Sequence, residues 1–454
     1  MSLPLNDPRL RHLVVLMLEN RSFDHLLGLS GIPELRGVKP GLYENKTGVG
    51  VAISVTDDAK DQGQLVSDPG HDFADVFEQM YGIPFDGSYP SVPRMSGFVR
   101  NYEKIAGAGH GPEVMRCFKP EKLPVLSTLA REYAVCDQWF SSVPGPTLPN
   151  RAFVHFGTSF GRLDMSPEYF RAKPSIYQRL KKAKRAGKIY YYAPWSGTQG
   201  LTFLLSDQRT YFGLWGDFKR DCKRNKLPEF SFIEPAYSDH EGTLACDQHP
   251  DHSVAAGDQF IRQVYDAIRS NPKTWETTML VIVWDEHGGL FDHEIPPAVL
   301  PDGFVSSSPP FSFDRLGVRV PAVVVSPFIE RQTVDHTVFE HASIPATVTE
   351  LFIGDQRTES PYAREQNANT FYHLATRKAA RTDRPKFDGS QIADARNVGG
   401  GRASSLQWNQ ARELHATLIR YYPEEARQLD PATIFTEADA KDFIARAMKV
   451  ITGK

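Results

Sequence analysis

Two short stretches of this chain put a carboxylate beside a second oxygen-bearing side chain, directly after an apolar run. Glu19 and Asn20 follow one such run, and the pair Asp285 and Glu286 follows another. Carboxylate and carboxamide oxygens suit a hard divalent cation. A cation also relieves the repulsion between adjacent carboxylates. Each stretch is therefore a candidate part of a metal site, although the first can equally cap a helix and the second can be a solvated turn.

A third stretch offers a nucleophile. Thr147 lies within Pro-Gly-Pro-Thr-Leu-Pro, where prolines and glycine fix a rigid turn before an expected helix over residues 150–157. Backbone N–H groups at the start of a helix favour a phosphate anion. A threonine hydroxyl is a weak nucleophile at neutral pH, but a bound cation can lower its pKa. The alternative is that Thr147 caps the helix, which is the usual role of such a residue.

Several histidines lie in short polar stretches and are candidates for proton transfer or phosphate contact. His71 lies in a Gly-His-Asp-Phe sequence, and the pair His249 and His252 precedes an expected helix. His287 and His293 belong to the second carboxylate stretch, together with two glycines that allow tight turns near a ligand. A lone histidine is more often structural than catalytic, so these positions alone assign no role.

The segments that must position these residues alternate between expected strands and helices. Apolar runs typical of buried strands cover residues 13–18, 189–192, 230–233, 279–284 and 322–325. Helical patterns cover residues 254–268 and 344–352. This alternation predicts an α/β fold with a doubly wound, mostly parallel sheet sandwiched by helices. The carboxyl edge of such a sheet is where ligands bind.

One catalytic domain followed by two smaller regions is expected. Residues 1–355 carry all the stretches above. Within them, residues 29–122 are rich in Gly, Pro and Asp with weak periodicity, which predicts irregular structure over the active-site edge. Residues 356–404, with three consecutive glycines, predict a linker or a wrapping segment. Residues 405–454 carry helical patterns and predict a small helical region.

Composition excludes several classes of protein. The 454 residues are 41% hydrophobic and 24% charged, which is ordinary for a soluble globular protein. The net charge of -3 implies no bulk attraction to nucleic acid. We expect no signal peptide, and the first apolar run is too short to span a bilayer. The four cysteines lack CxxC spacing, so we expect reduced thiols in a cytoplasmic or signal-independently exported protein.

Together the stretches resemble the phosphoesterase family that contains bacterial phospholipases C, plant non-specific phospholipases C and a group of bacterial acid phosphatases. The matching stretches are ENRSFDHLLG from Glu19, PGPTLPNR from Pro144, FIEP from Phe232, HPDHSVAAG from His249, DEHGGLFDH from Asp285 and FEHASIPATVTELF from Phe339. Threonine rather than serine at position 147 resembles the phospholipases more than the acid phosphatases. The resemblance implies a fold related to alkaline phosphatase, a doubly wound α/β sandwich.

The resemblance also implies roles for individual residues. One divalent metal ion (calcium, magnesium, manganese or zinc) would be held by oxygen ligands, namely Glu19, Asn20, Thr147, Asp285 and Glu286. The phosphate-facing catalytic histidines would be His71, His249 and His252. Substrate contacts would come from Asn150 and His287. His341 matches a family residue to which no role is assigned, and His25 has no assigned role either.

These roles predict two-step phosphoryl transfer. Thr147 attacks phosphorus, either His249 or His71 protonates the leaving alcohol, and water then hydrolyses the phosphothreonine. For a phospholipase C the products are diacylglycerol and a phosphorylated head group. The alternatives are a phosphomonoesterase acting on small soluble substrates and, in another class, a non-catalytic phosphate-binding protein.

A membrane contact is also expected for a lipid substrate. Residues 179–188 hold six basic residues that could touch an anionic lipid surface. Such a run is more often a solvated helix face.

Overall fold

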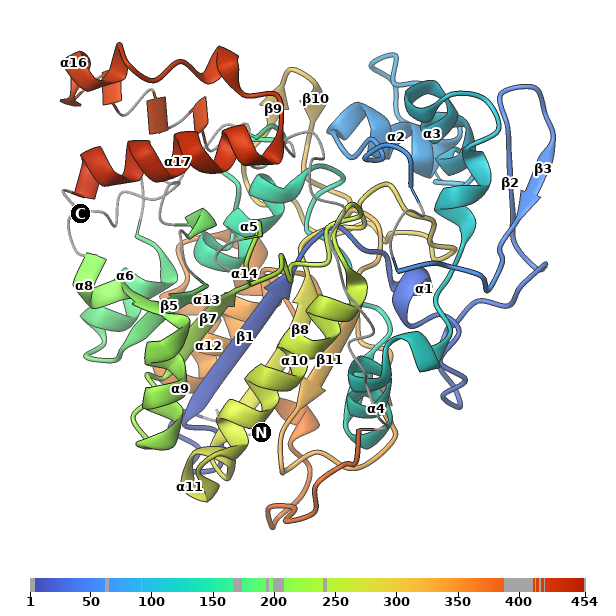
Figure 1. Ribbon diagram of the computed structural model, residues 1–454. Coiled ribbons are helices and arrows are strands. Elements are labelled where there is room, and N and C mark those ends of the chain that lie inside the picture. The colour runs from blue at the N-terminus through green and yellow to red at the C-terminus, as the bar shows by residue number, and fades with distance from the viewer. Residues whose placement is uncertain are drawn as a thin grey trace.

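An eight-stranded sheet forms the centre of the fold (Figure 1). The computed structural model describes residues 5–61, 65–90, 92–165, 174–192, 196–198, 208–239, 243–387, 411–412, 414–415, 418–419 and 421–452. The strand order is β12-β4-β11-β8-β1-β7-β5-β6. The strands are β1 (His12–Leu18), β4 (Ala134–Cys136), β5 (Gly187–Tyr191), β6 (Phe212–Leu214), β7 (Phe230–Glu234), β8 (Thr278–Trp284), β11 (Ala322–Val325) and β12 (Thr333–Asp335). Only β11 runs antiparallel to its neighbours, which confirms the mostly parallel sheet.

Helices cover both faces of this sheet (Figure 1). On one face α10 (Val254–Arg269) packs against α4 (Pro124–Glu132) and α9 (Trp215–Lys223). On the other, α12 (Ser343–Phe352) packs against α5 (Thr147–Phe156) and α6 (Ile176–Lys182). Short helices are α8 (Gln208–Tyr211), α11 (Pro272–Trp275), α13 (Gln356–Glu359), α14 (Ala363–Asn367) and the 3₁₀ helix η5 (Tyr372–Leu374). The predicted α/β class with helices on both faces is thus confirmed.

The two central strands align the residues that follow them. Every residue of β1 and of β8 is buried, because both faces of a parallel sheet are covered. The two strands pair in parallel with Leu18 opposite Trp284. The next residue on each strand is a carboxylate, Glu19 on one and Asp285 on the other. The sheet register therefore brings the two carboxylate stretches together at the carboxyl edge.

Residues 29–122 are more regular than expected. They form helices α2 (Phe73–Tyr81) and α3 (Phe98–Ala106), two 3₁₀ helices η1 (Gly111–Met115) and η2 (Pro120–Lys122), and a hairpin of β2 (Glu44–Lys46) and β3 (Ala52–Ser54). The sequence pattern did not indicate these elements because each is short, as α2 illustrates. Its buried residues Phe73, Val76, Phe77, Met80 and Tyr81 do follow a helical period, but over nine residues between loops rich in glycine and proline.

A turn, a hairpin and the start of a helix also lie at or near the carboxyl edge. The turn after β1 contains the one-turn helix α1 (Phe23–Leu26), and β9 (Ser306–Ser307) pairs with β10 (Pro310–Phe311) in a short hairpin. The expected helix over residues 150–157 begins three residues earlier, at Thr147. Pro149 then lies in the first turn, where a proline is tolerated because its missing N–H has no intrahelical partner.

The C-terminal part of the chain packs onto the main body. Residues 356–387 contribute Phe371 and Leu374 to the main core, and Glu365 forms a buried ion pair with Arg179 at 2.7 Å. The helices α16 (Pro423–Ala426) and α17 (Glu437–Thr452) build a second cluster with residues of α5, and the 3₁₀ helix η6 (Pro431–Thr433) lies between them in the chain. The glycine triplet at 399–401 and the rest of the expected linker after residue 387 lie outside the described residues, and the domain boundaries stay predictions.

Two further expectations concern the cysteines and membrane spans. All four cysteines are buried and unpaired. Among the described residues, no helix has the length and apolar character needed to cross a bilayer.

Candidate functional site

Asn20 adopts an unusual backbone conformation at the end of β1. Its φ of 54° lies in the left-handed region, which non-glycine residues rarely enter without a structural reason. The turn is held by a hydrogen bond of 3.1 Å from the Asn20 N–H to the Asp285 carboxylate. Gly288 lies so close that a Cβ there would be 2.2 Å from the Asn20 carbonyl oxygen. The two carboxylate stretches therefore fit together only with glycine at position 288.

Arg151 connects both strand ends to α5. Its guanidinium donates to Glu19 and to Asp285, each at 3.0 Å, and to the Tyr237 hydroxyl at 2.9 Å. Burial raises the pKa of Glu19 well above its usual range, and the positive charge of Arg151 opposes this effect. Burial likewise raises the pKa of Asp285, again against Arg151. Arg151 thus provides the positive charge that these two buried carboxylates need.

Thr147 is the first residue of α5 and is almost fully buried, with 1% of its surface exposed. Its hydroxyl lies 3.5 Å from the Asn20 side-chain oxygen. The preceding turn is braced by Asn150, whose amide donates to the carbonyls of Val143, Gly145 and Pro146 and accepts from the Val143 N–H. These contacts position the turn that carries Thr147, and the substrate-binding role of Asn150 stays a prediction.

Among the predicted metal ligands, Glu286 has a carboxylate oxygen without a hydrogen-bond partner. Its Oε2 accepts from the Gly288 N–H at 2.7 Å and lies 3.4 Å from His287 Nδ1, whereas the buried Oε1 has no hydrogen-bond partner. Burial acts to raise the pKa of Glu286, but the nearby His71 and His287 outweigh it and the pKa is lowered. A buried, ionised carboxylate oxygen without a partner requires a nearby cation or hydrogen-bond donor.

This arrangement fits a divalent cation chemically. Glu286 offers a free oxygen, and all the predicted ligands are oxygen donors, as hard cations require. The ligand atoms of Glu19 and Asp285 are partnered by Arg151, so the three carboxylates do not converge on one point as the structure stands. The proposed ligand set therefore remains a prediction supported by donor chemistry.

His71 and His249 are cationic at neutral pH. Burial would lower the pKa of His71, but the charges of Glu286 and Asp68 outweigh it and raise this pKa to about 9. Burial would also lower the pKa of His249, yet Asp251 and Asp68 raise it to about 10. His71 Nδ1 is fixed by the Pro69 carbonyl at 2.8 Å. Both side chains can therefore carry a proton to a leaving group and attract a phosphate anion.

The remaining predicted histidines bind neighbouring protein groups. His252 Nδ1 pairs with Asp247 at 2.7 Å, and His287 Nε2 binds the Gln79 side-chain oxygen at 2.7 Å. Burial lowers the pKa of His287, and the adjacent Glu286 opposes this effect. The structure thus links His287 to a predicted metal ligand, and its substrate role stays a prediction.

Two histidines without an assigned role are fully buried. His341 Nε2 donates to the Asp285 carbonyl at 2.5 Å, and burial lowers its pKa to about 4, so a neutral His341 supports the turn after β8. Burial also lowers the pKa of His25 well below its usual value. The His25 ring packs edge-on against Phe118.

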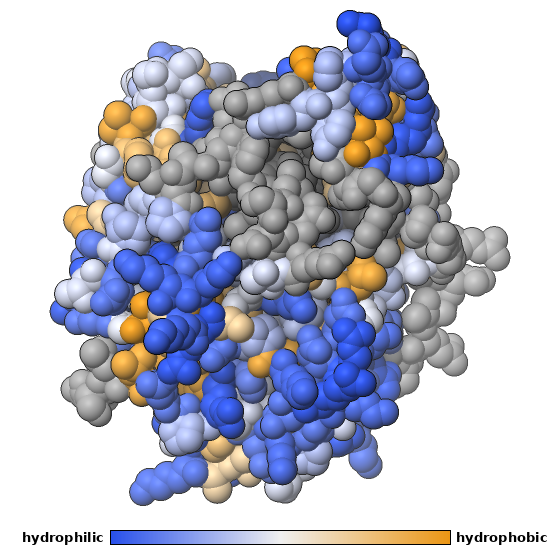
Figure 2. Space-filling model, turned by 90° about the vertical axis from the view of Figure 1, so that its left-hand side faces the viewer, coloured by the Kyte–Doolittle hydropathy of each residue, from blue (hydrophilic) through white to orange (hydrophobic). Residues whose placement is uncertain are grey.

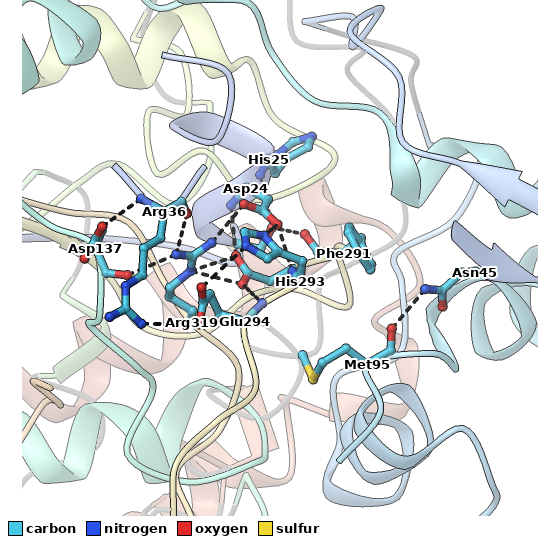
Figure 3. A network of polar contacts seen from close by, with 12 residues as sticks. Asp24, His25, Arg36, Asn45, Met95, Asp137, Phe291, His293, Glu294 and Arg319 are labelled. Carbon is cyan, nitrogen blue, oxygen red and sulfur yellow. Dashed lines mark hydrogen bonds and ion pairs between the residues drawn. The ribbon is translucent and has the colours of Figure 1, made fainter. Parts of the chain in front are cut away.

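A second buried network ties the turn after β1 to the turn after β8 (Figure 3). Arg319, which is fully buried just before β11, donates to Asp24 at 2.8 Å and to Asp292 at 3.0 Å. Asp24 also accepts from the backbone N–H and from Nδ1 of His293, at 2.8 and 2.7 Å. The Arg319 guanidinium stacks 4.1 Å above the Phe23 ring. These contacts fix the loop ends that carry the predicted metal ligands.

The same network contains a possible set of metal ligands, Asp24, Asp292 and His293. Their ligand atoms lie within 4.8 Å of one another, and no other group of three or more acidic, histidine or cysteine side chains in the described part of the chain does so. Arg319 already supplies a positive charge to both carboxylates. Burial would lower the pKa of His293, but Asp24 and the neighbouring acids raise it to about 10, which adds a second positive charge. The negative charges of Asp24 and Asp292 are therefore balanced by Arg319 and His293, and we interpret the cluster as structural.

Comparison with known proteins identifies the family of this chain. The model of the phosphoesterase family matches residues 10–353, which include all the predicted site residues. The chain belongs to the phosphoesterase family. It is 38% identical to non-specific phospholipase C4 of Arabidopsis thaliana over 406 residues, which cover 83% of this chain and 74% of the relative. Phospholipase C B of Mycobacterium tuberculosis (strain ATCC 25618 / H37Rv) is 27% identical over 393 residues, covering 74% and 71%.

Similarity to solved structures is low. A protein in the alkaline phosphatase superfamily from Vibrio parahaemolyticus matches with a TM-score of 0.33 and 11% identity, over 56% of this chain and 62% of that one.

Sequence reasoning missed Arg151, Asp247 and Asp251. Arg151 ends the PGPTLPNR stretch and lies four residues after Thr147, on the same face of the helix. Asp251 lies inside the HPDH stretch, two residues after the histidine that it contacts. Both residues lie inside sequence stretches that match the family, and this position could have marked them as candidate site residues. Asp247 gave no comparable signal.

Replacing Arg319 with Gln should lower the free energy of unfolding by about 3–5 kcal/mol, because Asp24 and Asp292 would stay buried without their cation. Urea denaturation followed by circular dichroism measures the change. The control is Arg427→Gln, since Arg427 is 73% exposed in its pair with Glu424 and exposed pairs contribute little. Equal effects of the two substitutions would contradict the structural role of the Arg319 network.

Proposed function

We propose that this phosphoesterase is a metal-dependent phospholipase C that cleaves a phospholipid to diacylglycerol and a phosphorylated head group through a phosphothreonine at Thr147. The observation that carries the proposal is the buried Thr147 hydroxyl beside Asn20, at the start of a helix and close to strand ends rich in carboxylates. The cationic His71 and His249 support it, because both attract a phosphate. So do the relatives named as phospholipases C.

One divalent cation would be held by oxygen atoms of Glu19, Asn20, Asp285 and Glu286, with the Thr147 oxygen facing it. When bound, it would supply positive charge for the phosphoryl oxygens and favour the ionised form of the hydroxyl. The unpartnered Oε1 of Glu286 and the choice of oxygen donors support this assignment. Calcium, magnesium, manganese and zinc all accept such ligands.

The residues of the chain then perform two displacements at phosphorus. In the first, the ionised Thr147 Oγ1 forms a bond to phosphorus, the bond to the glycerol oxygen breaks, and His249 or His71 gives its proton to that oxygen. In the second, water attacks the phosphothreonine, the same histidine takes a proton from the water, and the Thr147 oxygen leaves. Asp251 and Asp68 keep His249 protonated for the first step. Asn150 holds the turn that aims the hydroxyl.

Replacing Thr147 with Ala should reduce hydrolysis of phosphatidylcholine by at least about 1,000-fold, because the nucleophile is removed. Thr147→Ser should retain measurable activity, since it keeps a hydroxyl at the same place. Turnover is measured on phosphatidylcholine and on p-nitrophenyl phosphate, with circular dichroism to confirm folding. Full activity of Thr147→Ala would remove Thr147 from the mechanism. Turnover of the monoester alone by the unmodified protein would favour a phosphomonoesterase, and turnover of neither would favour a phosphate-binding protein.

Replacing Asp251 with Asn should move the alkaline limb of the kcat/KM profile to lower pH. The pKa of His249, raised to about 10 partly by Asp251, falls when that carboxylate is lost, so the protonated acid disappears at lower pH. The control is Asp266→Asn, because Asp266 is 55% exposed and pairs with Arg262 on the outer surface of α10. An unchanged alkaline limb in Asp251→Asn would show that His249 is not the acid.

Replacing Glu286 with Gln should weaken binding of a divalent cation to the metal-stripped protein at least about tenfold, because a charged oxygen ligand is lost. Isothermal titration with Mn²⁺ and with Ca²⁺ measures the affinity directly. His293→Gln serves as the comparison, since His293 belongs to the Asp24 cluster. Loss of binding in His293→Gln but not in Glu286→Gln would move the metal to that cluster.

A further inference from the structure

The exposed large apolar residues gather above the carboxyl edge of the sheet. Of the sixteen such residues in the described part of the chain, eleven lie in residues 29–122 and 288–320, which together hold less than a third of the chain. Both segments leave the sheet at the carboxyl edge, where the candidate site lies (Figure 1). Scattered exposed apolar residues are ordinary, but their concentration on one side indicates an interaction surface.

Two of these stretches form a rim that we define as residues 83–93 and 295–313. Its exposed apolar side chains include Val305 (74% exposed), Val92 (58%), Leu300 (53%), Ile83 (41%) and Tyr89 (41%). The two stretches touch each other, because the Tyr89 hydroxyl donates to the Pro310 carbonyl and the Tyr89 ring lies 6.1 Å from that of Phe311. The rim is therefore one continuous surface.

The rim carries almost no charge. Its thirty residues contain no lysine or arginine and only two acidic residues, Asp86 and Asp302. Asp302 is buried and accepts a hydrogen bond of 2.7 Å from the Thr158 hydroxyl. A surface of proline, valine, leucine and aromatic side chains without basic residues suits the uncharged interior and zwitterionic head groups of a bilayer. It does not suit a strongly anionic partner.

A buried aromatic layer joins the rim to the candidate site. Phe85 packs on Phe73, whose ring lies 5.3 Å from Phe311. Phe73 follows His71 by two residues. The same cluster contains Val143, from the turn before Thr147, and Phe153 of α5. The layer is rigid because its rings interlock, so the rim is held at a fixed position relative to the proposed nucleophile and the phosphate-facing histidine.

We propose that this rim is the surface by which the protein rests on a zwitterionic phospholipid bilayer, with the side chains of Val305, Leu300 and Val92 inserted among the lipids. The proposal rests on the phospholipase C function. Thr147, His71 and His249 are each at most 6% exposed, so the phosphate of a lipid must leave the bilayer plane to reach them. An apolar rim around that path lets the glycerol and acyl chains remain in an apolar environment while the phosphate enters.

The basic run at residues 179–188 lies elsewhere. Lys184 and Arg185 are in the turn that enters β5 at its amino end, so they lie at the edge of the sheet opposite the candidate site. Arg179 is buried in its pair with Glu365. The face over α6, α8 and α9 is mostly hydrophilic in its lower part (Figure 2). Contact through this region would turn the site away from the lipid.

The test compares Val305→Glu with Leu5→Glu, which adds the same charge at an exposed apolar residue near the amino edge. Each protein is sedimented with phosphatidylcholine vesicles and assayed on those vesicles and on monomeric dibutyrylphosphatidylcholine. We expect Val305→Glu to lose about tenfold or more in vesicle binding and vesicle turnover, and to keep its turnover of the monomeric lipid. Leu5→Glu should match the unmodified protein in all three measurements.

Other outcomes separate this proposal from the proposed function. If the unmodified protein turns over monomeric lipid without binding vesicles, or if all three proteins bind vesicles equally, the rim is overturned and the phospholipase C activity remains. Vesicle binding that depends on Val305 without turnover of any lipid would overturn the function and leave the surface. A dimer that Val305→Glu dissociates would make a second copy of the chain the occupant of the rim.

Discussion

The structure depends on how it balances negative charge buried at the carboxyl edge of the sheet. The register of β1 and β8 brings Glu19, Asp285 and Glu286 to neighbouring strand ends from which water is excluded. A buried carboxylate without a partner costs several kcal/mol, so each needs a positive charge or a set of hydrogen-bond donors. Arg151 serves Glu19 and Asp285, whereas Glu286 keeps one unpartnered oxygen. The edge therefore keeps one carboxylate oxygen without a hydrogen-bond partner, which is the kind of atom that a metal site needs.

The need to balance buried negative charge recurs in the turns that follow β1 and β8. Arg319 balances Asp24 and Asp292, and the resulting network fixes the two turns that carry the predicted ligands. The turns can be fixed so closely because Gly288 has no Cβ to meet the Asn20 carbonyl. A site whose groups are held in place before substrate arrives needs little reorganisation during reaction. The strained backbone of Asn20 is maintained by these surroundings.

The sequence was most informative where local pattern alone decides structure. The strands β1 and β8 follow from their unbroken apolar runs, and α10 begins where Ser253 caps it with a bond of 3.1 Å to the Ala256 N–H. Arg151 could not be assigned to Glu19, because the contact joins residues 132 positions apart and depends on both the sheet register and the rotation of α5. The regular helix α2 was missed because its period is too short to stand out from the surrounding loops.

Helix α5 explains why the chemistry and the charge balance are inseparable in this fold. Thr147 and Arg151 lie four residues apart, so they share one face of the helix and move together. Any rotation of α5 that shifted the proposed nucleophile away from Asn20 would also withdraw the guanidinium from Glu19 and Asp285, at the expense of two unpaired buried carboxylates. Phe153 on the same helix packs into the aromatic layer beneath the apolar rim. The position of one short helix therefore ties together the nucleophile, the buried charges and the surface proposed to meet the lipid.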